Sequence, residues 1–216
     1  MVTNIKNQTV ITIDGPAASG KSSVARGVAD ALNIPFVSSG LLYRAATYLT
    51  LLAKRNAHCA TEILDLLAEH DVQLEALAIE PNRVIIDNED ITAALHTDDV
   101  DANVSAVAKH PQIRRWVDER LRDIKGKFVV EGRDMGTAVF PKAAYKFYLT
   151  ASPEVRAKRR VGEREHNLQE ISEALMRRDE LDKKQLAPAS DAVAIDTSDM
   201  NLEDVIHSIL SKVEFR

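Results

Sequence analysis

The sequence predicts an α/β fold in which a five-stranded parallel sheet lies between two layers of helices. Two observations carry this prediction: a glycine-rich turn follows the first strand, and strand-like and helix-like segments then alternate along most of the chain. Such alternation is typical of parallel sheets whose ligands bind outside the carboxyl ends of the strands. A third observation, a change of pattern between about 57 and 97, predicts a small inserted antiparallel subdomain.

The first strand and the turn after it give the most specific signal. Residues 10–14 are a β-branched run, and residues 15–22 read GPAASGKS, which matches G-x-x-x-x-G-K-[ST] at every fixed position. In this pattern, backbone N–H groups hold phosphate oxygens at the start of a helix, the lysine reaches the β- and γ-phosphates and the hydroxyl binds Mg²⁺. The motif predicts a P-loop fold that binds a nucleoside triphosphate, with Lys21 as a catalytic residue and Ser22 as the metal ligand. The nucleotide-binding residues expected are Gly15, Pro16, Ala17, Ala18, Ser19, Gly20, Lys21, Ser22 and Ser23.

The segment after the loop continues the alternation. Apolar residues at helical spacing predict a helix over 22–32, and a short strand is expected over 36–38. The next helix is expected to run from 39 to about 55, with its first turns at the carboxyl end of that strand. Three residues in those turns are candidates for the same cleft: Ser39, Tyr43 and Arg44.

The inserted stretch, 58–97, combines one helix with short alternating strands. A helix is expected over 62–69 and strands over 72–76, 83–87 and 90–92, with turn residues between them. We expect this subdomain to cover a substrate; the alternative is a decoration that has no role in binding.

The rest of the chain returns to the first pattern. Helices are expected over 100–109 and 111–125, a buried strand over 128–130, a strand over 146–150, helices from 153 and over 168–184, a strand over 193–196 and a closing helix over 202–213. The chain thus reads as one domain, 1–216, with a core formed by 1–57, 98–155 and 173–216, the insertion 58–97 and a lid over 156–172.

Arginines supply the charge that phosphoryl transfer needs, because the transferred group spreads negative charge over its oxygens. Arg44 and Arg133 lie at expected strand ends near the loop. A second group, Arg156, Arg159, Arg160 and Arg164, is either a basic flap that closes over the triphosphate or a solvated helix face, and the phosphate loop favours the flap for Arg156 and Arg160. Asp14 is either a group of the metal's outer shell or the residue that ends the strand.

Composition limits the classes of partner. The net charge of -5 gives no general attraction to nucleic acid polymers or anionic membranes. The single cysteine, Cys59, excludes an internal disulfide, and a reducing, cytoplasmic location is expected. No apolar run approaches the length of a membrane span, and a monomer is expected.

Two features favour a kinase of a small acceptor over a GTPase switch. The sequence carries no N-K-x-D segment and no D-x-x-G after a hydrophobic strand, since the strand over 128–130 leads into Glu-Gly-Arg-Asp. The remaining alternatives are a kinase that acts on a different small acceptor, and a nucleotide-dependent switch that binds a protein partner.

Five segments together resemble the bacterial cytidylate kinases. They are 11–16 (ITIDGP) leading into the phosphate loop, 39–44 (SGLLYR), Ser105 with Arg114, 132–137 (GRDMGT) and 177–182 (RRDELD). The resemblance covers nearly the whole chain and implies the nucleoside-monophosphate-kinase fold, with a core, a monophosphate-binding insertion and a lid. It implies Mg²⁺-dependent transfer of the γ-phosphoryl group of ATP to CMP or dCMP, in pyrimidine nucleotide metabolism.

The resemblance also implies roles for single residues. Ser105, Arg114 and Asp134 match cytosine-reading positions, Arg44 and Arg133 match positions that hold the acceptor phosphate, with Tyr43 beside them, and Arg178 and Asp182 match a pair that meets the sugar hydroxyls. The sequence departs from the family pattern at Ser38, where an aspartate is common, and at Gln185, where an arginine is usual.

Overall fold

The computed structural model describes residues 8–161, 168–183 and 185–214. Its α-helices are α1 (Lys21–Leu32), α2 (Gly40–Leu52), α3 (Ala60–Glu69), α4 (Asp98–Ala108), α5 (Pro111–Asp123), α6 (Pro153–Val161), α7 (Leu168–Asp182) and α8 (Leu202–Leu210). Its strands are β1 (Gln8–Asp14), β2 (Phe36–Ser38), β3 (Val72–Glu75), β4 (Arg83–Ile86), β5 (Glu89–Asp90), β6 (Gly126–Gly132), β7 (Tyr145–Thr150) and β8 (Val193–Asp196).

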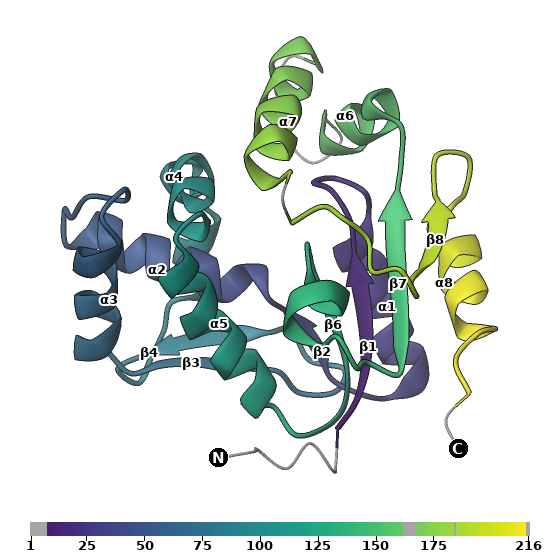
Figure 1. Cartoon of the computed structure of the whole chain (residues 1–216), viewed down its shortest axis with the longest axis horizontal. Helices are drawn as coiled ribbons and strands as arrows, with labels where there is room; N and C mark the ends of the chain where they lie inside the picture. The colour runs from purple at the N-terminus through teal and green to yellow at the C-terminus, as the bar shows by residue number, and fades with distance from the viewer. Residues whose placement is uncertain (1–7, 162–167, 184, 215–216) are drawn as a thin grey trace.

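Five of these strands form one parallel sheet, as the alternation predicts. Their order is β2-β6-β1-β7-β8. β1 pairs with β6 from Gln8 opposite Gly126 to Asp14 opposite Gly132, and Ser38 of β2 lies opposite Glu131. All five strands therefore end at one edge, above which α6 and α7 lie in Figure 1.

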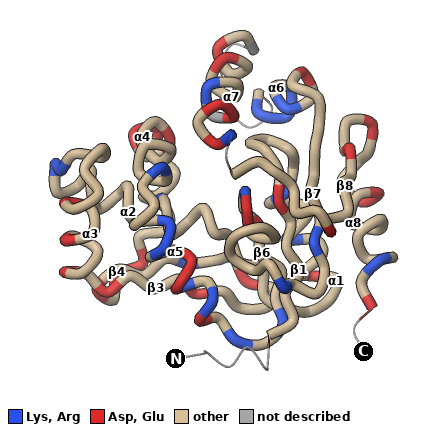
Figure 2. The backbone as a smooth tube through the Cα atoms, viewed as in Figure 1, with Lys and Arg blue, Asp and Glu red and all other residues tan. Residues whose placement is uncertain are grey.

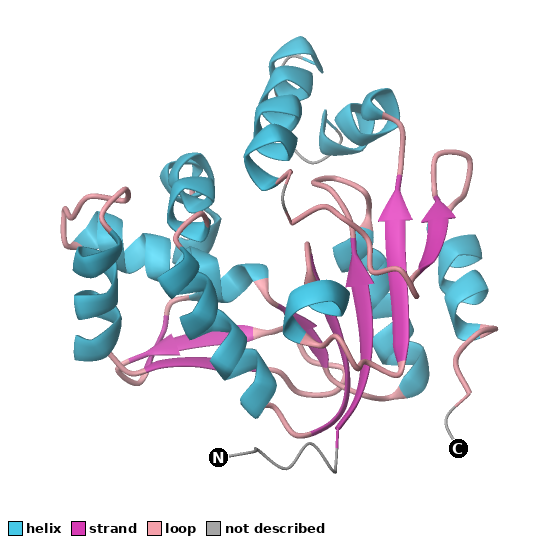
Figure 3. Cartoon of the chain, in the orientation of Figure 1, coloured by secondary structure: helices cyan, strands magenta, loops and turns pink. Residues whose placement is uncertain are grey.

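Successive side chains of the central strands enter different cores, because neighbours along a strand point to opposite faces. On one face, Ile11 and Ile13 pack with apolar residues of α1 and α8. On the other face, Val10, Phe128 and Val130 pack with residues of α2 and α5. These two layers of helices around the sheet confirm the three-layer fold (Figure 3).

The smaller sheet has the antiparallel order β3-β4-β5 and lies to the side of the main sheet, away from β8 (Figures 1 and 3). It shares a hydrophobic cluster with α2, α3, α4 and α5. Asn82, buried before β4, joins the insertion to the main sheet: its Oδ1 accepts the Ser38 N–H at 2.7 Å, and its Nδ2 donates to the Phe36 carbonyl at 2.7 Å.

Two local features differ from the pattern that the sequence suggests. The strand expected over 90–92 ends at Asp90, because the Asp90 carboxylate accepts the Thr92 N–H at 3.0 Å and starts a 3₁₀ helix, η1 (Thr92–His96). After β6 the chain forms a π-helical turn, η2 (Met135–Val139), which no sequence signal indicated.

Basic and acidic segments are interspersed along the backbone in Figure 2, in keeping with the modest net charge of -5. Among the residues that the structure describes, no helix has both the length and the apolar character needed to cross a membrane.

Candidate active site

A cavity of about 870 Å³ opens at the carboxyl edge of the main sheet. Its size falls in the range of ligand pockets, about 300–1,000 Å³. It is lined by residues from the phosphate loop, α2, α4, α5, the turn after β6, α6 and the region after α7. The predicted site residues that line it are Ala17, Ala18, Gly20, Lys21, Ser22, Ser23, Ser39, Tyr43, Arg44, Ser105, Arg114, Arg133, Asp134, Arg160 and Asp182.

The phosphate loop turns between β1 and α1 with two glycines at critical points. Gly20 has φ 87°, a left-handed conformation that favours glycine. Gly15 lies so close to β7 that an added Cβ would meet the Leu149 carbonyl oxygen at 2.3 Å. Ala18 also adopts a left-handed conformation, at φ 58°. Left-handed residues alternating with ordinary ones point backbone N–H groups into a concave anion site.

Three arginines bind the outside of this loop at alternate residues. Arg133 donates to the Gly15 carbonyl oxygen, Arg156 to that of Ala17 and Arg159 to that of Ser19, each at 3.2 Å. Carbonyl oxygens held on the outside cannot face a phosphate, so these bonds favour the conformation in which N–H groups face inward.

The predicted residues Gly15, Pro16, Ser19 and Arg156 are not among the described residues that line the cavity.

Two carboxylates on one face of α7 hold the first two of these arginines. Asp179 Oδ2 lies 2.6 Å from Arg156 Nη1, and Asp182 Oδ2 accepts from Arg133 Nε at 3.0 Å. Because the two aspartates are three residues apart, they share a helix face. The structure thus pairs Asp182 with Arg133. The side chain of Arg178 lies outside the described part of the molecule. Residues 162–167 of the expected lid, which include Arg164, also lie outside it.

Lys21 is buried beside a carboxylate from β6. Its Nζ lies 3.5 Å from the Pro16 carbonyl oxygen and 3.7 Å from Glu131 Oε2. The other oxygen, Glu131 Oε1, accepts the Ser38 hydroxyl at 2.7 Å. Ser38 therefore orients the Glu131 carboxylate toward the lysine.

A second ion pair faces the cavity from α5 and the turn after β6. Arg114 Nη2 contacts Asp134 Oδ2, and the Arg114 guanidinium lies 5.6 Å from the centre of the Tyr43 ring. Burial raises the pKa of the Tyr43 phenol, while the nearby Arg114 charge opposes that shift. Among the described residues, the buried Tyr43 hydroxyl has no hydrogen-bond partner, so a polar group of a ligand can bind it.

Asp14, at the end of β1, is hydrogen-bonded to the turn after β6. Its carboxylate is buried and accepts the Met135 N–H at 2.9 Å and the Gly136 N–H at 2.8 Å. Burial raises its pKa to about 6, and the two N–H bonds oppose the shift. Asp14 thus fixes the start of η2, and with it the position of Asp134, relative to β1.

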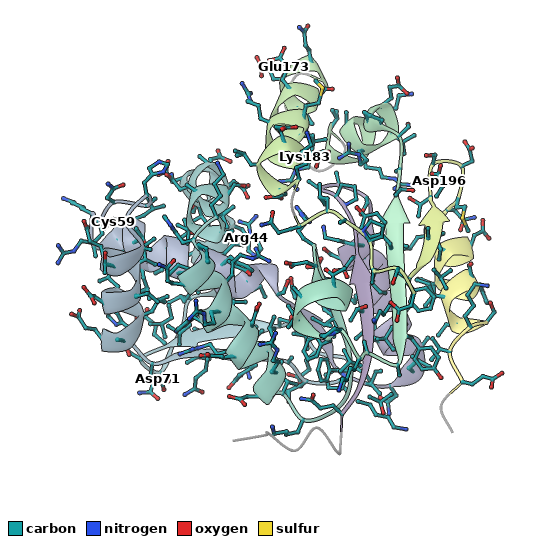
Figure 4. All side chains as sticks on the ribbon, viewed as in Figure 1. Arg44, Cys59, Asp71, Glu173, Lys183 and Asp196 are labelled. Carbon is teal, nitrogen blue, oxygen red and sulfur yellow. The ribbon has the colours of Figure 1, made fainter. Side chains whose placement is uncertain are left out.

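Arg44 lies where α2 meets the rest of the molecule, between the insertion side and the main sheet (Figure 4). Its Nη1 donates to the Leu95 carbonyl oxygen at 2.8 Å, and its Nη2 contacts Asp101 Oδ1. Asp101 Oδ2 lies 3.7 Å from Arg160 Nη2 of α6. Arg44, Lys21 and Asp134 line the same cavity.

Sequence reasoning missed several of these contacts. The sequence gives no prediction for Asp101, Asp179, Asn82 or Thr197, and its phosphate loop favours a nucleotide role for Arg156 and Arg160 more than for Arg159. Asp101 alone had a local signal, since it lies one helical turn before the candidate Ser105.

The donors near Lys21 fit a magnesium ion bound together with a nucleotide. The Ser22 hydroxyl lines the cavity, and Glu131 Oε2 is buried with no hydrogen-bond partner among the described residues. Mg²⁺ prefers oxygen donors and keeps several waters, with few protein ligands beside substrate phosphates. In keeping with this, the described residues contain no cluster of three or more histidine, cysteine, aspartate or glutamate side chains suited to a metal.

Comparison with known proteins gives consistent matches over the whole chain. A cytidylate kinase family model matches residues 11–215. A protein of Thermus thermophilus named "Cytidylate kinase" is 55% identical over 204 residues, which cover 94% of this chain and 98% of that protein. One of the same name from Deinococcus radiodurans is also 55% identical over 204 residues, with 94% and 98% covered.

Solved structures support the fold alone. An uncharacterized protein from Eubacterium ventriosum has a TM-score of 0.55 and 13% identity, over 97% of this chain and 100% of that one. The 55% sequence identity of these relatives is far above the 13% identity of the solved structure that shares the fold. The chain therefore belongs to the cytidylate kinase family.

Proposed function

We propose that this protein transfers the γ-phosphoryl group of ATP to CMP or dCMP, which gives ADP and CDP or dCDP. The observation that carries the proposal is one cavity lined both by the phosphate loop, with Lys21, and by the Arg114–Asp134 pair. The backbone N–H groups of the loop can bind a triphosphate. The Arg114–Asp134 pair can hydrogen-bond to a base whose edge presents a donor group beside acceptor atoms. The names of the relatives agree with this reaction.

The donor end of the reaction uses the loop. Its backbone N–H groups and Lys21 bind the β- and γ-phosphates, and Ser22 holds Mg²⁺ with the nucleotide. The metal, when bound, neutralises charge on the phosphate oxygens. Glu131, held by Ser38, keeps the Lys21 ammonium group in position beside the loop.

The acceptor end reads the base with two charged groups. The Asp134 carboxylate accepts from the exocyclic amine of cytosine, and the Arg114 guanidinium donates to the acceptor atoms of the same edge, with Ser105 beside them. Uracil presents an acceptor where cytosine presents the amine, so a carboxylate there disfavours UMP. Arg178 and Asp182 are assigned to the sugar hydroxyls.

Phosphoryl transfer needs alignment and charge stabilisation more than it needs a base, because the acceptor phosphate oxygen is already anionic. Arg44, Arg133 and Arg160 bind the acceptor phosphate and the transferred group, and Arg156 acts through the loop carbonyl that it binds. Residues 58–97 serve as the monophosphate-binding subdomain and 156–172 as the lid. The enzyme is proposed to act as a cytoplasmic monomer.

An acceptor panel tests this function. ADP release is measured with ATP, Mg²⁺ and each of CMP, dCMP, UMP, AMP and GMP, with shikimate as a non-nucleotide acceptor. CMP and dCMP should give the highest kcat/KM. A preference for another acceptor would refute the substrate, and slow turnover that no acceptor changes would favour a nucleotide-dependent switch.

A further inference from the structure

Asp101 contacts two arginines that reach the cavity from different parts of the fold. Arg44 comes from α2 and Arg160 from α6, far apart in the sequence. Asp101 Oδ1 contacts Arg44 Nη2, and Asp101 Oδ2 lies 3.7 Å from Arg160 Nη2. Each carboxylate oxygen thus addresses a different guanidinium group.

The two arginines line the cavity, whereas Asp101 is not among the described residues that line it. Its side chain is 14% exposed, and that of Arg44 is 15% exposed. A carboxylate that sits behind two guanidinium groups does not occupy the space of a ligand. It offsets the repulsion between the two positive charges and limits the directions in which they can turn.

The surroundings fix the Asp101 carboxylate itself. Asp101 lies in the first turn of α4, where the helix dipole favours a negative charge. Ser105 lies one turn further along the same helix and lines the cavity. The Leu95 carbonyl oxygen accepts from Arg44 Nη1 at 2.8 Å, so Arg44 has two fixed anchors. The start of α4 therefore sets the position of one arginine and of a cavity-lining hydroxyl together.

We infer that Asp101 is a positioning residue for phosphoryl transfer: it brings the guanidinium groups of Arg44 and Arg160 to one part of the cavity wall, where they bind the acceptor's phosphate. This inference rests on the proposed function. A phosphate of charge near −2 needs more than one guanidinium group for full hydrogen bonding, and pre-aligned groups lose less entropy when it binds.

Two different roles of Asp101 predict opposite changes in the binding of the acceptor. If Asp101 competed with the acceptor phosphate for the two arginines, removing its charge would tighten binding of the acceptor. If Asp101 positions the arginines, removing its charge loosens them and weakens binding. The sign of the change in KM for CMP separates the two.

The experiment compares Asp101→Asn with Asp99→Asn in the full chain. Asp99 is an exposed residue of the same helix turn, so its variant makes the same charge change without the two arginines. We expect Asp101→Asn to raise the KM for CMP about tenfold and to lower kcat, with the KM for ATP within about twofold. Asp99→Asn should match the parent on all three constants.

A charge-retaining variant, Asp101→Glu, guards against loss of folding and should raise the KM for CMP less than Asp101→Asn does. The inference is overturned if Asp101→Asn leaves the KM for CMP unchanged or lowers it, or if Asp101→Glu raises the KM as much as Asp101→Asn does. A parent protein that phosphorylates neither CMP nor dCMP would instead refute the proposed function. In that case, isothermal titration of CMP against the parent and Asp101→Asn still tests the inference: weaker binding by the variant supports it, and equal or tighter binding overturns it.

Discussion

Arg159 donates a hydrogen bond to the Ser19 carbonyl oxygen at 3.2 Å and so joins α6 to the outside of the phosphate loop. The same guanidinium group donates to the Thr197 hydroxyl at 3.0 Å and to the Thr197 carbonyl oxygen at 2.7 Å. Thr197 is buried and follows β8, so one arginine ties three segments together at the nucleotide end of the sheet.

Arg159→Gln should therefore loosen the loop and raise the KM for ATP by about fivefold to tenfold, with a smaller change in the KM for CMP. The matched control is Lys158→Gln, because Lys158 is an exposed residue of the same helix and carries the same charge. Steady-state kinetics with each substrate varied in turn measures the effect. Equal kinetic constants in both variants would mean that the Arg159 contacts contribute nothing to nucleotide binding.

Lys21→Ala should lower kcat by about a factor of 10³, since it removes a fixed positive charge from the transferred phosphoryl group. The fold should persist, because the loop retains its glycines and its three outer arginines. Circular dichroism and thermal unfolding check the fold, and the ADP-release assay checks the rate. The exposed Lys142→Ala serves as the control. Retention of more than about a tenth of the parent's kcat in Lys21→Ala would contradict the assigned role.

The fold and the donor site could be predicted because their signals are local. The phosphate loop is a contiguous motif, and alternating strands and helices predict a parallel sheet whose carboxyl ends meet. That rule predicts that Arg44 and the turn after β6 lie near Lys21, and one cavity does join them.

The contacts that orient the site could not be predicted from local patterns. Arg159 and Ser19 are separated by 140 residues, and Asp14 and Gly136 by 122. Asp179 reads in the sequence as an ordinary polar residue of a helix, and the resemblance assigns Asp182 to the sugar hydroxyls. Only tertiary packing brings these two carboxylates to Arg156 and Arg133. The π-helical turn has no local signature, since its first residues are fixed by a carboxylate from β1.

Asp134→Ala should weaken the binding of CMP and reduce the preference for CMP over UMP. The carboxylate disfavours the uracil carbonyl, and each correct base contact contributes about 1–3 kcal/mol of discrimination. The ratio of kcat/KM for CMP to that for UMP should therefore fall about tenfold or more. The exposed Asp123→Ala is the control. If Asp134→Ala discriminates between CMP and UMP as sharply as the parent, Asp134 does not read the base.

The buried Asp14 predicts a specific pH dependence of stability. Burial raises its pKa from 3.8 to about 6 in the folded state, so the folded protein holds this proton more tightly than the unfolded chain does. The contribution of Asp14 to the free energy of unfolding must then decrease as the pH rises from about 4 to about 6, and it stays low above that range. The decrease amounts to about 3 kcal/mol, the cost of a carboxylate buried away from water.

Asp14→Asn removes this titration but also weakens a hydrogen bond to η2, because an amide group has only one acceptor oxygen. The variant is therefore expected to be less stable than the parent at pH 4, and the gap should narrow or reverse by pH 7. Urea unfolding at pH 4, 5, 6 and 7 measures both proteins. Asp118 is expected to titrate in the same pH range, because burial raises its pKa to about 6 as well. Adding Asp118→Asn to the parent and to Asp14→Asn removes that second titration from both. If the difference in unfolding free energy between these two proteins then stays constant with pH, Asp14 does not titrate in this window.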